Sequence, residues 1–145
     1  MTREASRTER LSPGSPILVV LRGNSASGKT TTAREVRRRF GRGLALLEQD
    51  YLRRTILREH DSANIDPVAP TFITATARTA LDLGYHVILE GILHTERYAD
   101  ALHQLIDHHP GPTAVFYLDV SVRHEALHYR VEVRELHRRP VAAGW

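Results

Sequence analysis

Residues 17–30 read ILVVLRGNSASGKT, and this stretch decides the fold of the chain. Its first five residues, Ile17 to Leu21, are all apolar, which predicts a short strand buried on both faces of a parallel sheet. The segment from Gly23 to Thr30 then has the spacing G-x-x-x-x-G-K-T of a phosphate-binding P-loop. That motif requires a strand before it and a helix after it, and the surrounding sequence predicts both.

The fixed positions of this motif are those that phosphate binding requires. Gly23 and Gly28 allow the loop to curl tightly, so that backbone N–H groups point toward a polyphosphate. The following helix presents its positive end to the same phosphates. Lys29 is predicted to contact the β- and γ-phosphates as a catalytic residue, and the Thr30 hydroxyl is predicted to bind Mg²⁺. The residues expected to bind the nucleotide are Gly23, Asn24, Ser25, Ala26, Ser27, Gly28, Lys29, Thr30 and Thr31.

Lysine usage supports the same interpretation. The chain has 20 basic residues, and Lys29 is the only lysine among them. A compact ammonium group suits a position among phosphate oxygens better than a planar guanidinium does. Arginine-rich codon usage explains the many arginines, but it does not explain where the lone lysine falls.

The composition is that of an ordinary globular domain. The chain has 145 residues, 41% of them hydrophobic, and no cysteine, which excludes disulfides, thiolate metal sites and a cysteine nucleophile. A net charge of +3 does not argue for a nucleic-acid partner. No apolar run approaches the ~20 residues of a membrane span, and residues 1–16 lack the apolar core of a signal peptide. We therefore expect a cytoplasmic protein without a membrane partner, with a disordered lead-in over 1–16 and one domain over 17–145.

Apolar segments alternate with segments of helical periodicity along the rest of the chain. We expect strands at 17–21, 44–48, 86–91 and 114–118, and helices at 29–40, 52–60, 71–83, 95–108 and 121–136. Ala33, Val36 and Phe40 share one face of the first helix, whose many arginines are expected to be solvated rather than to bind a partner. Thr95 is the expected cap of the helix at 95–108. This alternation predicts an α/β fold, a three-layer P-loop NTPase sandwich with a mostly parallel sheet and right-handed crossovers.

Three expected strands end in acidic residues, at the edge of the sheet where ligands of such folds bind. Asp50 follows the second strand beside Arg53 and Arg54, and we expect it to orient or deprotonate an acceptor hydroxyl; the alternative is a helix N-cap. Glu90 ends the strand that we place beside the P-loop strand, where it is expected to hold the metal-bound water or the acceptor. Asp119 ends the fourth strand and is expected to be structural.

The segments GNSASGKT, LEQDYLRR, VILEGIL and FYLDV together resemble those of P-loop small-molecule kinases. The most similar branch is the group that includes zeta toxins, chloramphenicol phosphotransferase and gluconate-kinase-like proteins. This resemblance covers residues 17–135 and implies ATP and Mg²⁺ as cofactors. It implies that Asp50 is the acceptor-side base or ligand and that Glu90 is the acidic residue ending the third strand. Arg97 is the counterpart of an arginine that binds the acceptor, and we place Arg54 with it as a substrate residue.

Lids of this family carry arginines that close over the transferred phosphoryl group. The matching region of this chain contains Arg123, Arg130, Arg134, Arg138 and Arg139, of which we assign the catalytic role to Arg130. Family members continue past the lid into a fifth strand and a closing helix, whereas no strand-like run follows Arg139 here. We therefore expect a C-terminally short domain whose sheet lacks its last strand.

Residues 124–128 read HEALH and match the zinc-peptidase pattern H-E-x-x-H. No downstream ligand is evident beyond His137, and the segment falls in the expected lid of a nucleotide-binding fold. We interpret it as a solvated helical face rather than a zinc site.

The sequence therefore predicts an ATP- and Mg²⁺-dependent kinase that phosphorylates a hydroxyl of a small molecule. One alternative is a nucleotide-binding module without acceptor chemistry. A second is a 5′-hydroxyl polynucleotide kinase in which Tyr51, Arg53 and Arg54 contact the nucleic-acid end. The mild charge and the lack of aromatic residues interleaved with basic ones weigh against this second alternative.

Overall fold

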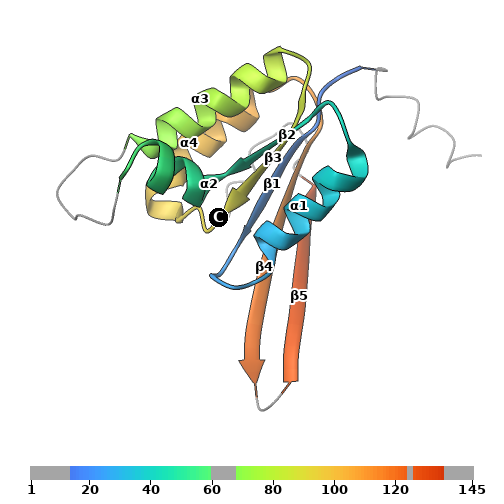
Figure 1. The fold of residues 1–145 in the computed structure, drawn as a ribbon, viewed down its shortest axis with the longest axis vertical. Helices are drawn as coiled ribbons and strands as arrows, with labels where there is room; N and C mark the ends of the chain where they lie inside the picture. The colour runs from blue at the N-terminus through green and yellow to red at the C-terminus, as the bar shows by residue number, and fades with distance from the viewer. Residues whose placement is uncertain (1–13, 60–67, 124–125, 136–145) are drawn as a thin grey trace, which may run out of the picture.

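The computed structural model describes residues 14–59, 68–123 and 126–135 of the chain. The strands form one sheet in the order β2-β3-β1-β4-β5, in which the first four are parallel and β5 runs antiparallel to β4 (Figure 1). This architecture confirms the expected α/β fold. The elements in chain order are β1 (Leu18–Gly23), α1 (Lys29–Phe40), β2 (Leu44–Glu48), α2 (Gln49–Tyr51), the π-helical turn η2 (Leu52–Ile56), α3 (Ala69–Asp82), β3 (His86–Gly91), α4 (Thr95–His108), β4 (Thr113–Arg123) and β5 (Ala126–Glu135).

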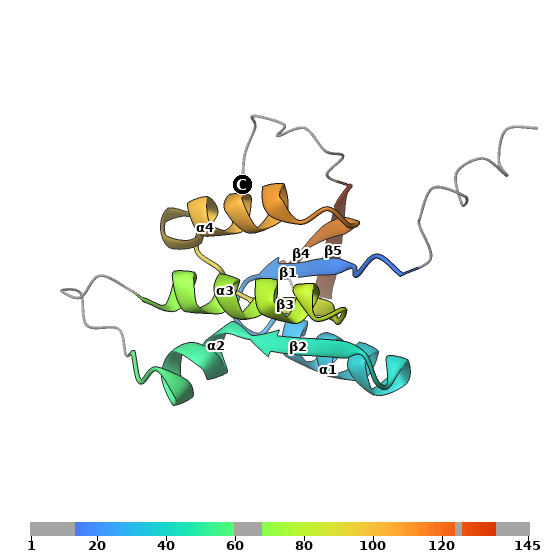
Figure 2. The same cartoon turned by 90° about the horizontal axis from the view of Figure 1, so that it is seen from above.

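Helices cover both faces of the sheet (Figures 1 and 2). On one face, α1 packs through Ala33 onto a small apolar cluster that includes Leu21 and Ile88. On the other face, α3 and α4 lie against each other and cover a larger cluster built on alternate residues of the strands, such as Leu18 and Val20. Burying each such leucine or valine stabilises the fold by about 1.5–3 kcal/mol, so this second cluster is the main core.

Most expected boundaries are confirmed. The strands at 44–48 and 86–91 and the helix at 95–108 match β2, β3 and α4. The helix expected at 52–60 begins earlier, because α2 follows β2 without a loop and continues into η2. No helix within the described ranges is long and apolar enough to cross a membrane.

The segment at 121–136, which we expected to be a helix, is the main error of the sequence analysis. β4 continues to Arg123, and the following strand β5 pairs with β4 along its length, from Glu135 opposite Ala114 to Ala126 opposite Arg123. The periodicity explains the error, because apolar residues alternate with polar ones in this segment, which is a strand pattern that its many charges obscured. The apolar residues of that alternation are Leu127, Tyr129, Val131 and Val133.

The β4–β5 hairpin changes two further expectations. Asp119 lies inside β4 rather than at its end, and the sheet has a fifth strand within residues that we expected to be helical. The hairpin extends past the other strands, because β1 pairs with β4 only as far as Leu118 (Figure 1). Residues 136–145, where we expected no strand, and residues 1–13 of the expected lead-in lie outside the described residues.

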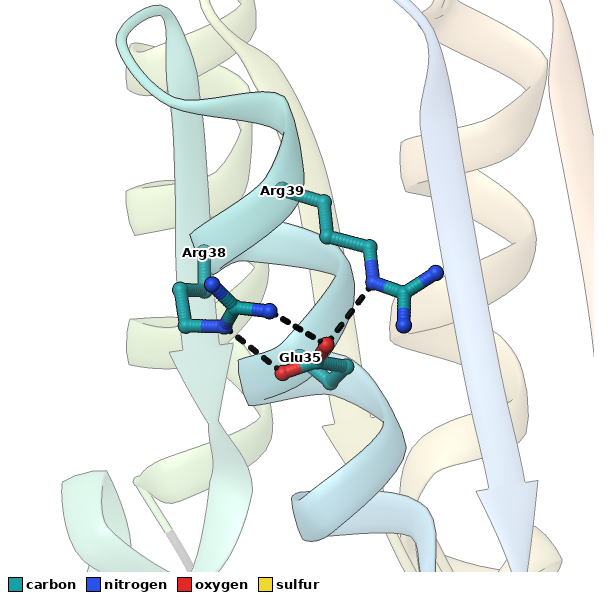
Figure 3. Close-up of polar contacts among 3 residues, drawn as sticks. All are labelled: Glu35, Arg38 and Arg39. Atoms are coloured by element: carbon teal, nitrogen blue, oxygen red, sulfur yellow. Dashed lines mark hydrogen bonds and ion pairs between the residues drawn. The ribbon is translucent and has the colours of Figure 1, made fainter.

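The surface of α1 matches one expectation and contradicts another. Its arginines are exposed as expected, and Arg38 and Arg39 converge on the carboxylate of Glu35 at 2.7–2.8 Å (Figure 3). Val36 and Phe40, however, are 44% and 53% exposed, so the expected apolar face of this helix is buried only near its N-terminal end.

Candidate active site

The loop between β1 and α1 is shaped by residues in left-handed or related conformations. Ala26 has a φ of 60° and Gly28 a φ of 86°. A Cβ at Gly28 would meet no atom within 4 Å, so the backbone conformation, and not crowding, favours glycine there. A Cβ at Gly23 would lie 2.0 Å from the carbonyl oxygen of Leu118, so only glycine fits this close approach of β1 to β4.

Lys29 begins α1 and is buried inside this loop. Its side chain is 6% exposed, and its Nζ donates to the carbonyl oxygen of Asn24 and, at 3.2 Å, to the hydroxyl of Ser27. Asn24 is also held from β4, because the Tyr117 hydroxyl donates to its Oδ1 at 3.3 Å. Burial lowers the pKa of Lys29, and the carboxylate of Glu90 opposes that shift. The loop oxygens therefore hold a partly desolvated ammonium group at the N-terminal end of the helix.

Thr30 and Glu90 meet directly at the same end of α1. Glu90 is the next-to-last residue of β3, which lies beside the P-loop strand as expected, and the Thr30 hydroxyl donates to its Oε1 at 2.9 Å. Glu90 is 3% exposed. Burial raises the pKa of this carboxyl, the hydrogen bond from Thr30 opposes the shift, and Glu48 on the neighbouring strand raises the pKa further.

These groups fit a Mg²⁺–triphosphate. A hydroxyl and a carboxylate are the oxygen ligands that Mg²⁺ prefers, and Mg²⁺ commonly completes its shell with phosphate oxygens and water. The described residues contain no cluster of three acidic or histidine side chains that could hold a metal ion by themselves. Thr30 and Glu90 would therefore hold the metal together with the phosphates, and Lys29 would neutralise phosphate charge.

Glu48 and Arg34 stand beside this group, and the sequence analysis missed both. Arg34 on α1 donates two hydrogen bonds, at 2.6 and 2.8 Å, to the two carboxylate oxygens of Glu48. Glu48 lies opposite Glu90 in the strand register, so the pair joins α1 to β2 beside the metal ligands. The available signal was the end of the second strand, where Glu48 follows two leucines.

Arg22 lies on the opposite face of the sheet, under the start of α4. It is 8% exposed, and its Nη2 donates to the carbonyl oxygen of Leu93 at 2.9 Å and to the Thr95 hydroxyl at 3.1 Å. Burial lowers the pKa of Arg22. The expected cap role of Thr95 is therefore wrong: the N-cap residue of α4 is His94, whose side chain makes no capping hydrogen bond. The sequence signal that could have identified Arg22 is its position as a charged residue directly after the apolar run at 17–21.

A buried hydrogen bond joins α2 to α4 near Arg22. The side-chain amide of Gln49 donates to the Tyr98 hydroxyl at 3.1 Å, and the two residues are 6% and 3% exposed. Gly91 makes room for this contact, because a Cβ there would lie 2.6 Å from the Cβ of Gln49. Gln49 was not predicted as a site residue from the sequence.

Asp50 lies on α2, where its side chain is 67% exposed. Its Oδ1 is 2.9 Å from Nε of Arg54 and 3.6 Å from Nη2 of Arg53. The N-cap alternative is wrong, because the residue in the N-cap position of α2 is Glu48. Because β2 and β3 are parallel and Glu48 lies opposite Glu90, the segment after β2 begins at the same edge of the sheet as Glu90. Asp50 and Arg54 belong to this segment. Arg97 is exposed on the first turn of α4.

The remaining predicted site residues are Arg130 and Thr31. Arg130 lies in β5 opposite Asp119. The expectation that it belongs to a helix is therefore wrong. Residues 126–128 of the HEALH segment also belong to β5, which contradicts their interpretation as a helical face, and residues 124–125 lie outside the described residues. Thr31 is exposed and lines an open, shallow cavity of about 360 Å³ on the outer face of α1.

The mostly parallel sheet, the glycine loop and the buried lysine define a domain of the P-loop class with a kinase-like fold. The sequence matches the family model described as an AAA domain over residues 18–143, and the chain belongs to this family. None of the curated proteins matches the chain at a significant level.

Solved structures with a similar fold include kinases. The APS kinase CysC of Mycobacterium tuberculosis is 19% identical with a TM-score of 0.61, covering 79% of this chain and 84% of that one. A structure of the same kinase with AMPPNP and APS is 22% identical with a TM-score of 0.59, covering 72% and 63%. The Pnkp1/Rnl/Hen1 RNA repair complex is 17% identical with a TM-score of 0.55, covering 79% and 36%. The chain thus spans less than two thirds of the length of two of these three. At these identities the likeness shows the fold alone.

Proposed function

We propose that this chain is an ATP- and Mg²⁺-dependent phosphotransferase that transfers the γ-phosphoryl group of ATP to a hydroxyl of a small molecule. The observation that carries the proposal is the contact of the Thr30 hydroxyl with the buried Glu90 carboxylate, beside the buried ammonium of Lys29. These three groups supply one cation and two metal ligands at a helix N-terminus, which is the arrangement that phosphoryl transfer needs. The kinases among the fold's neighbours support the same class of reaction.

In this proposal the residues of the two sheet faces have different tasks. The P-loop amides and Lys29 bind the β- and γ-phosphates and stabilise the charge that develops on them. Thr30 and Glu90 would hold a Mg²⁺ ion, which would supply neutralisation of phosphate charge. Asp50 accepts the proton of the acceptor hydroxyl while the bond from that oxygen to the γ-phosphorus forms and the bond to the ADP oxygen breaks. The exposure of Asp50 supports this role, because a base that meets a diffusing acceptor must be accessible. Arg54, Arg97 and Arg130 stay predictions as acceptor-binding and phosphoryl-binding residues.

The first test is Lys29→Ala against a matched control, Arg37→Ala, an exposed arginine on the same helix. Loss of one charge-assisted donor to the phosphates should lower ATP affinity or transfer by ~10²–10³-fold, whereas the control should be unchanged. ATP affinity is measured by calorimetry, and transfer by ADP release with a panel of hydroxyl compounds. Equal ATP affinity and turnover in Lys29→Ala and the control would overturn the P-loop assignment.

The same panel separates the proposal from its alternatives. ATP binding without ADP release for any acceptor would favour a nucleotide-binding module. Transfer to a 5′-hydroxyl oligonucleotide, and not to small molecules, would favour a polynucleotide kinase. The zeta-toxin, chloramphenicol-phosphotransferase and gluconate-kinase-like group stays a prediction, and the acceptor that the panel identifies will test it.

A further inference from the structure

The strand β5 forms one edge of the sheet. It pairs with β4, and among the described residues no strand lies against its other side. β5 is 10 residues long, whereas strands usually have about 5–6, and the β4–β5 hairpin extends past the end of β1 (Figure 1). The outer side of such a strand presents a row of backbone N–H and C=O groups, so a further strand can add to the sheet there.

One face of β5 is apolar up to this edge. Residues directly opposite each other in an antiparallel pair lie on the same face of a sheet. Phe116 and Leu118 of β4 pack against the apolar cluster under α1, and their register partners on β5 are Val133 and Val131. Because residues of a strand alternate between the two faces, Tyr129 belongs to the same face. A strand that adds to β5 therefore continues an apolar surface when its own residues on this face are apolar.

The other face of β5 has charges of opposite sign on the two sides of Val131, at Arg130 and Glu132. Two β5 strands can pair antiparallel so that their Val131 residues lie opposite each other. Arg130 of each copy then lies opposite Glu132 of the other, and on the apolar face Tyr129 lies opposite Val133. Opposite charges in such cross-strand positions stabilise a sheet.

Other registers of the same pairing are less favourable. Sliding one strand by two residues sets either the two Arg130 residues or the two Glu132 residues opposite each other, and like charges in these positions destabilise the pairing. Sliding by one residue sets the apolar face of one strand against the charged face of the other. The sequence of β5 is therefore complementary to itself in the register centred on Val131.

We propose that this chain forms a two-fold symmetric dimer in which the outer edges of two β5 strands pair antiparallel, centred on Val131. The pairing joins the two five-stranded sheets into one continuous sheet. A two-fold axis perpendicular to the sheet keeps both α1 faces on the same side and makes each contact twice, as a self-complementary interface requires. This assembly does not depend on the proposed kinase activity.

Introduced cysteines test the register directly, because the chain has none of its own. In the proposed dimer the two copies of residue 131 lie directly opposite, with Cβ atoms ~4.5–5.5 Å apart. The two copies of residue 133 are four positions apart along the strands, roughly 13 Å. Val131→Cys should therefore form a disulfide-linked dimer with oxidised glutathione, and the matched control Val133→Cys should do so at least ~10-fold more slowly. Equal rates, or no cross-link in Val131→Cys, would overturn the proposal.

A charge reversal tests the pairing without chemical cross-linking. Glu132→Arg sets like charges opposite each other at both symmetry-related positions, so the Kd of the dimer should rise by ~10–100-fold. Glu135→Arg is the matched control, because residue 135 lies opposite Leu127 in the proposed register and its Kd should stay that of wild type. Sedimentation equilibrium over a concentration series measures Kd. A wild-type monomer throughout the series, or equal Kd values for the two variants, contradicts the dimer. If Glu132→Arg does not fold, Glu132→Gln replaces it, with an expected rise of ~3–10-fold.

Discussion

The two faces of the sheet differ in the buried polar residues that lie near the carboxyl ends of the strands. On the α1 face, the ionisable residues Lys29 and Glu90 are only 6% and 3% exposed. Burial lowers the pKa of Lys29 and raises that of Glu90, so it favours the neutral form of each. On the α4 face, Gln49 and Tyr98 are similarly buried but neutral and are hydrogen-bonded to each other, and the buried Arg22 is fixed by the Leu93 carbonyl and the Thr95 hydroxyl. Buried charge costs stability, whereas a satisfied neutral hydrogen bond contributes to it. The comparison teaches that the α1 face is arranged for a ligand and the α4 face for rigidity.

Asp50→Asn should produce the largest effect, because Asp50 is the proposed base and its accessible side chain, 67% exposed, belongs to neither buried set. Removing the charge while keeping the shape should lower turnover by ~10²–10⁴-fold, the usual contribution of a positioned base. ATP affinity should barely change, since the P-loop carries it. The control is Asp107→Asn, an exposed carboxylate on α4. Near-normal turnover in Asp50→Asn would exclude the role as base, and a loss of ATP affinity would move Asp50 to the metal site.

Glu90→Gln tests whether the buried charge of Glu90 lowers the stability of the fold while it supports Mg²⁺-dependent ATP binding. The amide keeps an acceptor for the Thr30 hydroxyl but removes the buried charge, so Mg²⁺-dependent ATP affinity should fall by ~10–100-fold while the melting temperature rises. The sign follows from the raised pKa of Glu90: the folded protein binds a proton at this carboxyl more tightly than the unfolded chain does, so the charge on Glu90 costs stability above the ordinary pKa of 4.5 and this cost is lost as the pH falls.

The melting temperature of Glu90→Gln should therefore exceed that of wild type most at pH 8, and the difference should shrink as the pH falls toward 4.5. Glu35→Gln is a control of opposite sign, because the hydrogen bonds from Arg38 and Arg39 lower the pKa of that carboxyl. A Glu90→Gln variant that melts below wild type at pH 8 would contradict the view that this face carries a destabilising charge.

The same two faces explain how far the sequence alone could go. The P-loop and the position of Glu90 were predictable because each is fixed by local spacing and by the end of an apolar strand. Gln49 and Arg22 were not, because their partners Tyr98, Leu93 and Thr95 are 49 or more residues away in sequence. Contacts of this kind arise from the order of the strands and have no local pattern.

The prediction for the segment that forms the β4–β5 hairpin failed for a different reason. Its local pattern is an alternation of apolar and polar residues, but the sequence analysis interpreted the polar, arginine-rich segment at 121–136 as a helix, in the region where the resemblance placed the lid arginines. Arg130 was assigned from that lid, so its catalytic role now lacks the helical setting on which it was based. An argument from periodicity alone would have predicted the strand.

Tyr98→Phe should have the smallest effect, and it tests the α4 face. Losing the hydroxyl removes one buried hydrogen bond and leaves the Gln49 amide without that partner, so the free energy of unfolding should fall by about 1–2 kcal/mol, measured by urea denaturation. Tyr85→Phe, at a tyrosine that is 46% exposed, should be neutral. ATP affinity should be unchanged in both variants, in contrast to Glu90→Gln. Replacing both partners, as Gln49→Leu with Tyr98→Phe, should cost less than the sum of the single changes, because no buried polar group is then left unpaired. Strictly additive losses would mean that the contact does not stabilise the fold, and that the rigidity of this face comes from apolar packing alone.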